Sequence, residues 1–182
     1  MTVTGLSALV RRYQAIIYIF VKKFFLMEKI DSLNQVAEFH KTFNAPILDL
    51  PQIPSEERSY LRISLLQEEL DELKKAIEDK NLVEIADALC DLQYVLSGAV
   101  LEFGLGEKFV ELFDEVQRSN MSKACDNEQQ AQETVLHYKN LGTEAHYEKS
   151  GNKYNVYRIS DHKILKNKYY STANLISILN KK

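Results

Sequence analysis

Two stretches of the chain with helical periodicity carry carboxylates where apolar residues are expected. The first stretch, LLQEELDELKKAI, contains Glu68, Glu69 and Glu72, and the second, LVEIADALCDLQYVL, contains Glu84 and Asp87, with Asp91 one turn later. At about 100° per residue, Glu69 and Glu72 fall inside the apolar arc of the first helix. The acids of the second helix share one narrow strip beside its apolar arc. We therefore expect both helices to direct carboxylates toward the core.

A cluster of carboxylates in such a place is costly unless a cation lies among them. Like charges three or four residues apart on a helix repel, and a desolvated carboxylate destabilises the fold unless it is paired. Lysines are placed on the outer face or at the end of the first helix, and only Arg62 lies on its acidic side. A hard divalent cation such as Mg²⁺, which takes oxygen ligands and often binds together with phosphates, resolves this conflict. The simpler alternative is a solvated acidic face.

The elements that must position these acids are predicted to be mainly helical. Six glycines and three prolines leave little room for an all-β fold with many turns. Helical patterns cover about 31–43, 55–79, 82–103, 107–118 and 127–140, with Asp31 or Ser32 and Ser55 as N-caps and Gly104 after the third. Ser150-Gly151-Asn152 indicates a β-hairpin, and Ser171 is expected to cap a short helix over 172–179. The sequence predicts an antiparallel multi-helix bundle with a small C-terminal β-hairpin and a short helix.

Charge divides the chain into three parts. Residues 1–26 carry a net charge of +4, residues 27–144 carry −13, and residues 145–182 carry +6. We expect an N-terminal extension over 1–26, with native translation starting at Met27, then a helical domain over 27–144 and a basic, Tyr-rich appendage over 145–182. An acidic body of this size argues against nucleic acid as a partner. The lysines and tyrosines of the appendage are a pattern that can bind nucleic acid, but a small sheet packed on the body or on a partner subunit is the preferred interpretation.

Two further features bear on location. The apolar run from Tyr13 to Val21 is too short for a membrane span and lacks the cleavage motif of a signal peptide, which leaves a basic amphipathic anchor as the alternative. Cys90 and Cys125 have no metal-type spacing and little support for a disulfide. We expect a cytoplasmic protein with no membrane partner.

The acidic pattern as a whole has the form EExxE followed, after an eleven-residue gap, by ExxD. It resembles the MazG-like all-α nucleoside triphosphate pyrophosphohydrolases, a superfamily that includes dimeric dUTPases and phosphoribosyl-ATP pyrophosphohydrolase. The resemblance covers about residues 31–125 and extends to DLQYVLSGAVLEFG and RSNMSK. It implies an all-α bundle of this type, dependence on Mg²⁺ with Mn²⁺ as the alternative ion, and a homodimer or dimer of dimers. The implied reaction cleaves a nucleotide between its α- and β-phosphates, giving the monophosphate and pyrophosphate.

The resemblance also implies roles for single residues. The family's metal ligands match Glu69, Glu72, Glu84 and Asp87. Glu68 matches the remaining acid, as a ligand or as the group that orients water, and either Glu68 or Glu69 could accept the proton of that water. Asp91 is expected to support the ligands or hold a water molecule beside the metal.

The segment that closes over the phosphates in the nearest subgroups matches Asn120 and Lys123. Lys123 would supply a point charge for a phosphate, and Asn120 would donate a hydrogen bond to it. The structural alternatives are a helix C-cap for Asn120 and a solvated side chain for Lys123. His40 is interpreted as a packed core histidine rather than a catalytic one.

Two classes of function follow from the sequence. The first is a Mg²⁺-dependent enzyme acting on a nucleotide, and the second is a non-catalytic helical protein that uses its acidic face or basic tail to bind a partner. A P-loop NTPase is excluded because no glycine-rich phosphate loop is present. The base and sugar stay open, with dUTP, dCTP, a damaged nucleotide and phosphoribosyl-ATP as candidates.

Overall fold

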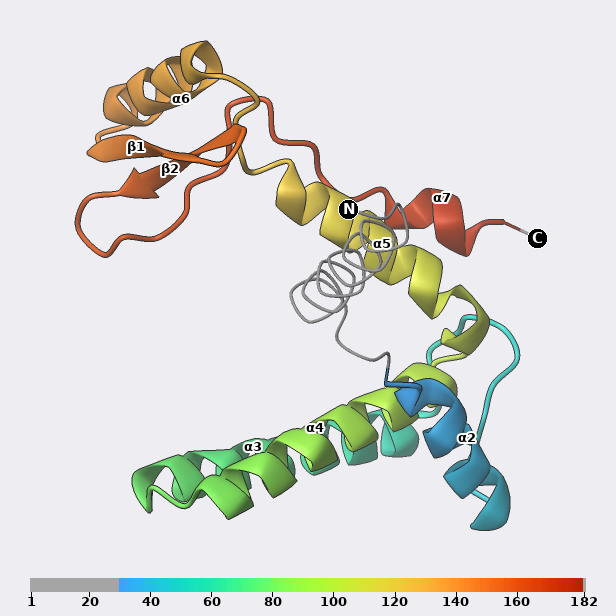
Figure 1. The fold of residues 1–182 in the computed structure, drawn as a ribbon. Helices are drawn as coiled ribbons and strands as arrows, with labels where there is room; N and C mark the ends of the chain where they lie inside the picture. Colours follow the sequence, from blue (N-terminus) through green and yellow to red (C-terminus); the bar gives the residue numbers. More distant parts are fainter. Residues whose placement is uncertain (1–29, 182) are drawn as a thin grey trace, which may run out of the picture.

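The computed structural model describes residues 30–181 of the 182-residue chain, and these residues are mainly helical (Figure 1). The predicted extension over 1–26 and the predicted start at Met27 lie outside the described residues. The helices are α2 (Ser32–Thr42), α3 (Glu56–Glu78), α4 (Leu82–Glu102), a 3₁₀ turn (Gly106–Lys108), α5 (Phe109–Met121), α6 (Glu128–Asn140) and α7 (Leu175–Leu179). Strands β1 (Ala145–Ser150) and β2 (Lys153–Arg158) form one antiparallel pair. The predicted fold class is confirmed.

Capping side chains set several of these boundaries. Asp31 accepts a hydrogen bond from the backbone of Asn34, and Ser55 accepts one from Arg58, so both predicted N-caps are confirmed. Ser171 is not the cap of the last helix, and that prediction was wrong. Asn174 caps α7 instead, because its side chain accepts from the backbone N–H of Ser177. The helix is thus shorter than predicted, and the residues before it run extended along α5 (Figure 1).

The longest helices, α3 and α4, form an antiparallel hairpin whose open end is fixed by a buried carboxylate. Glu102, the last residue of α4, is 1% exposed and forms ion pairs with Arg58 and Arg62 of α3. Arg58 also donates from Nε to the second carboxylate oxygen at 3.1 Å. Two guanidinium groups therefore hold both oxygens of one carboxylate, which is the arrangement that a buried charge requires.

This ion-pair cluster also fixes α2. His40 of α2 is buried, its Nδ1 lies 2.8 Å from the carbonyl oxygen of Pro46, and its Nε2 lies 3.5 Å from Arg62. Gly98 of α4 leaves the space for these groups, because a Cβ there would lie 2.7 Å from Arg62 and 3.0 Å from His40. His40 is therefore a packed core residue, as the sequence predicted.

Gly104 ends α4 at a position that only glycine fits. Its φ is +66°, and a Cβ would meet the carbonyl oxygen of Leu50 at 1.9 Å. The extended segment over 48–52 can then pack against the end of α4, where Leu48 donates to Leu101 and Gln52 donates to Phe103.

The β-hairpin and α6 share a small separate core, which we call the C-terminal module (residues 125–170). Cys125, Ala131, Val156 and Leu165 are its buried residues. The backbone of Cys125 pairs with Tyr154, and Tyr157 pairs with Ile164, so the free edge of β2 is partly covered. Because α6 packs on the hairpin, the predicted boundary between 144 and 145 falls inside this packed unit.

Helix α5 runs from the open end of the α3–α4 hairpin to the C-terminal module, and α7 lies beside α5 (Figure 1). Within residues 30–181, no single helix is long and apolar enough to cross a membrane. Helices α4 and α5 satisfy that test of length and composition only when taken together, with a bend of 110° between them.

The ion pairs of Glu102 predict a specific dependence of stability on this carboxylate. Burial raises the pKa of Glu102, but hydrogen bonds and charges from Arg62 and Arg58 outweigh it, so the pKa lies below its usual range. A lowered folded-state pKa contributes stability above the unfolded-state pKa, and this contribution is lost as the pH falls through the folded-state value.

We predict that Glu102→Gln lowers the free energy of unfolding by about 3–5 kcal/mol, because two arginines lose their buried partner. The loss should be largest near pH 7 and should shrink in acid, as measured by urea unfolding across pH. Asp161→Asn is the matched control, since it removes a carboxylate from an exposed pair with Arg158 and should change stability far less. Equal losses in the two variants would contradict the role given to Glu102.

Candidate active site

The antiparallel register of α3 and α4 brings their acids to one level of the hairpin. Arg58 lies opposite Glu102 at the open end of the hairpin. Arg62 lies opposite Gly98, four residues closer to the hairpin turn on each helix. Continuing this register places Glu69 opposite Asp91, about two turns beyond the buried arginine.

The electrostatics of Glu69 support this placement. Burial raises the pKa of the Glu69 carboxyl above its usual value, and negative charges raise it further, from Asp91, Glu72, Glu68 and Asp87 in decreasing order. Each neighbouring charge disfavours a second negative charge at Glu69. Since two of these neighbours belong to α3 and two to α4, carboxylates of both helices lie around Glu69.

The burial of the other acids differs from the sequence expectation. Glu69 and Asp91 are half-buried, but Glu68, Glu72, Glu84 and Asp87 are exposed. The expectation that both helices direct carboxylates toward a core was therefore wrong for Glu72, Glu84 and Asp87. The physical reason is that α3 and α4 cover each other along one face only, and much of the apolar arc predicted to be core, such as Leu70 at 50% and Ile77 at 55%, is itself exposed.

Five of the six predicted acids thus form a carboxylate cluster, defined here as Glu68, Glu69, Glu72, Asp87 and Asp91. Glu84 is not among the charges that shift Glu69, and the register places it opposite Ala76, nearer the hairpin turn. All the donor atoms are carboxylate oxygens, the type that Mg²⁺ and Mn²⁺ accept. Within residues 30–181, no three of them meet at the spacing of a preformed metal site.

Asn120 and Lys123 lie elsewhere, at the C-terminal end of α5. Lys123 donates from Nζ to Oδ1 of Asn120 at 2.7 Å, and its backbone N–H donates to the carbonyl oxygen of Asn120. Asn120 is not the helix C-cap, because Ser122 occupies that position. The structure therefore brings these two residues to each other, but within residues 30–181 no hydrogen bond or ion pair joins either of them to the carboxylate cluster. Figure 1 shows this end of α5 beside the C-terminal module and away from the α3–α4 hairpin.

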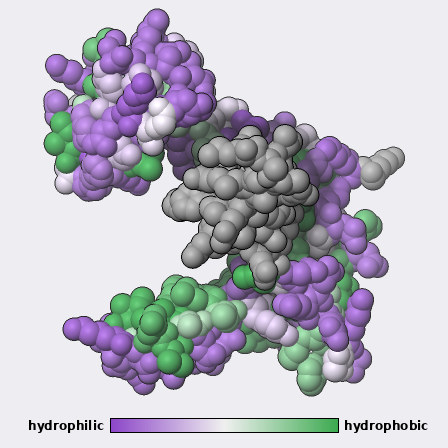
Figure 2. All heavy atoms as spheres, in the orientation of Figure 1, coloured by the Kyte–Doolittle hydropathy of each residue, from purple (hydrophilic) through white to green (hydrophobic). Residues whose placement is uncertain are grey.

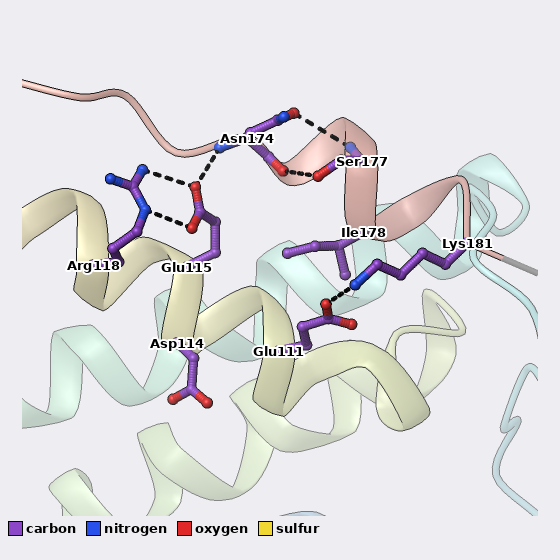
Figure 3. A pocket seen from close by; sticks show the side chains of 8 residues that line it. All are labelled: Glu111, Asp114, Glu115, Arg118, Asn174, Ser177, Ile178 and Lys181. Atoms are coloured by element: carbon purple, nitrogen blue, oxygen red, sulfur yellow. Dashed lines mark hydrogen bonds and ion pairs between the residues drawn. The ribbon is translucent and has the colours of Figure 1, made fainter.

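A pocket of about 510 Å³ between α5 and α7 contains none of the predicted site residues (Figure 3). Its charged side chains are largely paired with each other: Glu115 with Arg118, and Glu111 with Lys181. The hydrogen bonds from Arg118 and from the backbone of Asn174 lower the pKa of Glu115 to about 2. Glu115, through the backbone of Asn174, and Glu111, through Lys181, thereby fasten α7 to α5.

The sequence reasoning missed the residues that hold the end of α5 in place. Tyr170 contacts Ser119 by a hydroxyl–hydroxyl hydrogen bond of 2.8 Å, and the backbone of Asn167 donates to the carbonyl oxygen of Lys123 at 3.1 Å. The available signal was the clustering of Asn, Tyr and Ser in NKYYST, which the predicted helix cap at Ser171 did not explain.

Residues 36–120 match the family described as phosphoribosyl-ATP pyrophosphohydrolase. That family is part of the MazG-like all-α NTP pyrophosphohydrolase superfamily. The matched segment includes the whole carboxylate cluster and ends at Asn120, so both helices that carry the acids lie within it. The match indicates a pyrophosphohydrolase in general terms.

The chain is also similar to an uncharacterized protein of Acanthamoeba polyphaga mimivirus, with 27% identity over an alignment of 243 positions. The alignment covers 84% of this chain and 97% of the viral protein. Because residues 1–120 are only about two thirds of the chain, an alignment of this extent must include part of the region after Asn120. The similarity is therefore not confined to the pyrophosphohydrolase segment.

The repulsion within the carboxylate cluster predicts that a divalent cation stabilises the fold. Added Mg²⁺ at about 100 times its Kd should raise the Tm by about 5–10 °C in a thermal melt. Glu69→Gln should raise the Tm in the absence of metal, because it removes the most strongly opposed negative charge, and should reduce the Mg²⁺-dependent increase. Asp71→Asn, on the same helix but hydrogen-bonded to Gln67, should leave that increase unchanged. A Tm that does not respond to Mg²⁺ or Mn²⁺ would argue for a non-catalytic helical protein.

Proposed function

We propose that the protein is a Mg²⁺-dependent nucleotide pyrophosphohydrolase, with Mn²⁺ as the alternative ion. It adds water across the anhydride between the α- and β-phosphates, which yields the nucleoside monophosphate and pyrophosphate. The observation that carries this proposal is the set of carboxylates from α3 and α4 around Glu69, inside the segment that matches the pyrophosphohydrolase family.

The donor set supports a role in binding a metal. Glu69, Glu72 and Asp87 of the cluster would hold it together with Glu84, which lies about one turn before Asp87 on α4. Asp91 would support Glu69 from the facing helix. When bound, a divalent cation supplies positive charge for the phosphate oxygens and lowers the pKa of water. Hydrolysis of an anhydride needs little more than such charge neutralisation and good positioning, which fits a site with no candidate nucleophile among its side chains.

The remaining residues have roles of their own in the proposal. Glu68 is an exposed member of the cluster and carries an acceptor oxygen that can orient water and take its proton. The raised pKa of Glu69 makes it the second candidate for that proton. Lys123 and Asn120 would bind the phosphates from the other side once the end of α5 approaches the hairpin.

The first test is the product of turnover. We expect pyrophosphate, and no orthophosphate, from at least one member of a panel of NTPs, dNTPs and phosphoribosyl-ATP in the presence of Mg²⁺. The combined substitution Glu72→Gln with Asp87→Asn should lower the rate by at least about 10- to 100-fold, the range that outer partners of a metal site alone can cause. Asp71→Asn should retain the wild-type rate. Orthophosphate as the sole product, or an unaffected double variant, would exclude the proposal.

We also propose that two copies of the chain pair through the α3–α4 hairpin, as a homodimer or within a dimer of dimers. Figure 2 shows apolar side chains gathered over this hairpin. Ile63, Leu70 and Ile77 on α3, and Leu82, Leu89 and Leu96 on α4, recur at spacings of seven residues and are all at least 43% exposed. An exposed apolar face of this extent is characteristic of an interface. Burying it against a second hairpin would form a four-helix bundle and would desolvate the adjacent carboxylates.

The pairing predicts a change in mass when the face is charged. The wild type should elute as a dimer or tetramer in size-exclusion chromatography with light scattering. Leu89→Glu should shift it toward the monomer and should also lower pyrophosphate release. Leu136→Glu is the control, because Leu136 is similarly exposed but lies on α6. A monomeric wild type at micromolar concentration would contradict the pairing without affecting the chemistry proposed above.

A cytoplasmic location completes the proposal. Cys90 and Cys125 are both free thiols, as a reducing compartment would leave them.

A further inference from the structure

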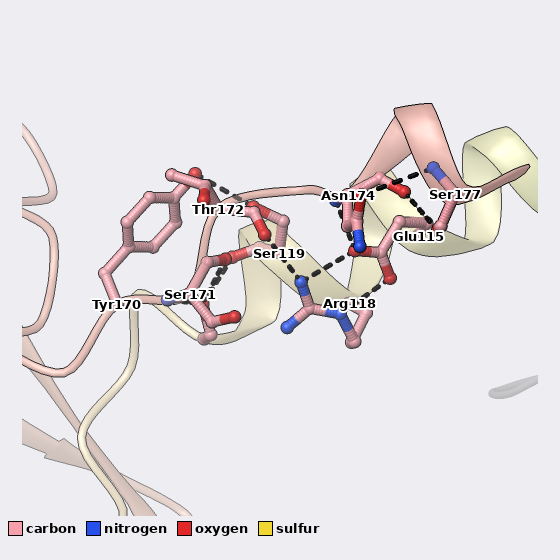
Figure 4. A network of polar contacts seen from close by, with 9 residues as sticks. Glu115, Arg118, Ser119, Tyr170, Ser171, Thr172, Asn174 and Ser177 are labelled. Atoms are coloured by element: carbon pink, nitrogen blue, oxygen red, sulfur yellow. Dashed lines mark hydrogen bonds and ion pairs between the residues drawn. The ribbon is translucent and has the colours of Figure 1, made fainter. Parts of the chain in front are cut away.

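The end of α5 that carries Asn120 and Lys123 is fastened by a segment about fifty residues later in the chain. We call residues 118–124 the α5 terminal segment and residues 167–174 the tail segment. Figure 4 shows part of the contacts between them, including those of Arg118 with Thr172 and of Ser119 with Tyr170. Arg118 donates to the carbonyl oxygen of Thr172 at 3.0 Å, and the backbone of Ser171 donates to the hydroxyl of Ser122 at 3.0 Å.

Tyr170 of the tail segment contacts the residue that precedes Asn120. Its hydroxyl lies 2.8 Å from the hydroxyl of Ser119, which is 4% exposed. Lys166 lies over the ring of Tyr170 at 4.5 Å, so the ring has a contact that does not depend on the hydroxyl. Because Ser119 precedes Asn120 in the last turn of α5, this bond fixes the turn that presents Asn120.

Asn167 holds the residues on the other side of Lys123. Asn167 is 6% exposed, and its backbone N–H donates to the carbonyl oxygen of Lys123. Its side-chain amide donates to the carbonyl oxygen of Ala124 at 3.1 Å. The amide oxygen of Asn167 accepts from Thr134, which is fully buried in the C-terminal module. The backbone around Lys123 is thereby connected to the core of that module.

The pair held in this way has the chemistry of an anion site. Oδ1 of Asn120 accepts from Lys123, which leaves the Nδ2 group of Asn120 as a donor. The ammonium of Lys123 has two further N–H donors. One fixed contact therefore orients a neutral donor and a positive charge in the same place, which is what recognition of a phosphate oxygen needs.

We propose that the tail segment positions Asn120 and Lys123 as a preformed phosphate-binding pair, so that Tyr170 and Asn167 are positioning residues for the substrate's phosphates. This inference rests on the proposed function for its ligand. The simpler alternative is that the tail only stabilises α5, with Lys123 offsetting the negative end of the helix dipole. Under that alternative, the tail segment has no need to hold the backbone on both sides of Lys123. Substitutions in the tail segment would then lower stability but leave the affinity for phosphate unchanged.

Tyr169 and Tyr170 supply a matched pair of substitutions. Both rings lie under a lysine, and both hydroxyls make one hydrogen bond, but the hydroxyl of Tyr169 donates to Glu133 of α6 rather than to α5. The probe is inorganic pyrophosphate with Mg²⁺, measured by calorimetry, so that no choice of base or sugar enters. Tyr170→Phe should weaken binding by about 3- to 10-fold, the size expected for one hydrogen bond, whereas Tyr169→Phe should stay within about twofold.

A double-mutant cycle separates positioning from stability. In a Lys123→Ala background, Tyr170→Phe should weaken pyrophosphate no further, because its effect passes through Lys123. Hydrogen exchange of residues 118–124 should be faster in Tyr170→Phe than in Tyr169→Phe. Equal affinities in the two tyrosine variants, or additive effects in the cycle, would overturn the inference.

Failure of the proposed function has a different signature. In that case no nucleotide in the panel would release pyrophosphate, while bound pyrophosphate would still respond to Tyr170→Phe. Pyrophosphate that does not bind the wild type at all would overturn this inference directly, and hydrogen exchange would then report a purely structural contact.

Discussion

The buried carboxylate of Glu102 is the constraint on which the arrangement of the helices depends. A carboxylate that is 1% exposed is unstable without counter-charges, and here it receives two guanidinium groups from one face of α3. That requirement sets the distance and the register between α3 and α4, and through Arg62 and His40 it also fixes α2. Since an antiparallel pair of helices has a single register, fixing it at Glu102 also determines which acids face each other further along. The opposition of Glu69 and Asp91 is therefore a consequence of an ion pair two to three turns away.

The hairpin beyond this ion-pair cluster has two unsatisfied surfaces, and one partner for each would resolve them. The carboxylate cluster lacks a counter-charge, and the exposed apolar face of α3 and α4 lacks a covering partner within residues 30–181. The two are linked, because burying the apolar face also lowers the dielectric constant around the carboxylates. Their mutual repulsion then increases, and so does the stabilisation that a cation would bring. Metal binding and pairing of two chains would then stabilise each other, although they involve different faces of the same helices.

Local rules were sufficient to predict most of the elements. Periodicity indicated the helices, Asp31 and Ser55 marked two starts, Gly104 marked an end, and Ser150-Gly151-Asn152 marked the turn between β1 and β2. What depends on long-range contacts could not be predicted. Glu102 and its arginines are 40 and 44 residues apart, and nothing local to an apolar helix end indicates that its acid is buried. Ser171 was wrongly predicted to be a helix cap for the same reason, because its actual partner is the distant Ser122. The burial of Glu72 was overestimated because the pattern does not show which part of an apolar arc is covered within one chain.

The candidate site is divided between two groups of residues, the carboxylates and the Asn120–Lys123 pair, which lie on different helices. The acids are on a hairpin whose geometry is set by Glu102, whereas Asn120 and Lys123 are on the end of α5, whose geometry is set by the tail segment. Each part is held by its own set of contacts, so in the proposed reaction the substrate's phosphates and a metal would bridge two separately positioned parts. Such a division places positive groups where they do not neutralise the acids in the absence of substrate, since Lys123 is occupied by Asn120 rather than by a carboxylate. In the proposed reaction the cluster would thus stay available to a cation, and the two parts would approach each other when a phosphorylated ligand binds to both.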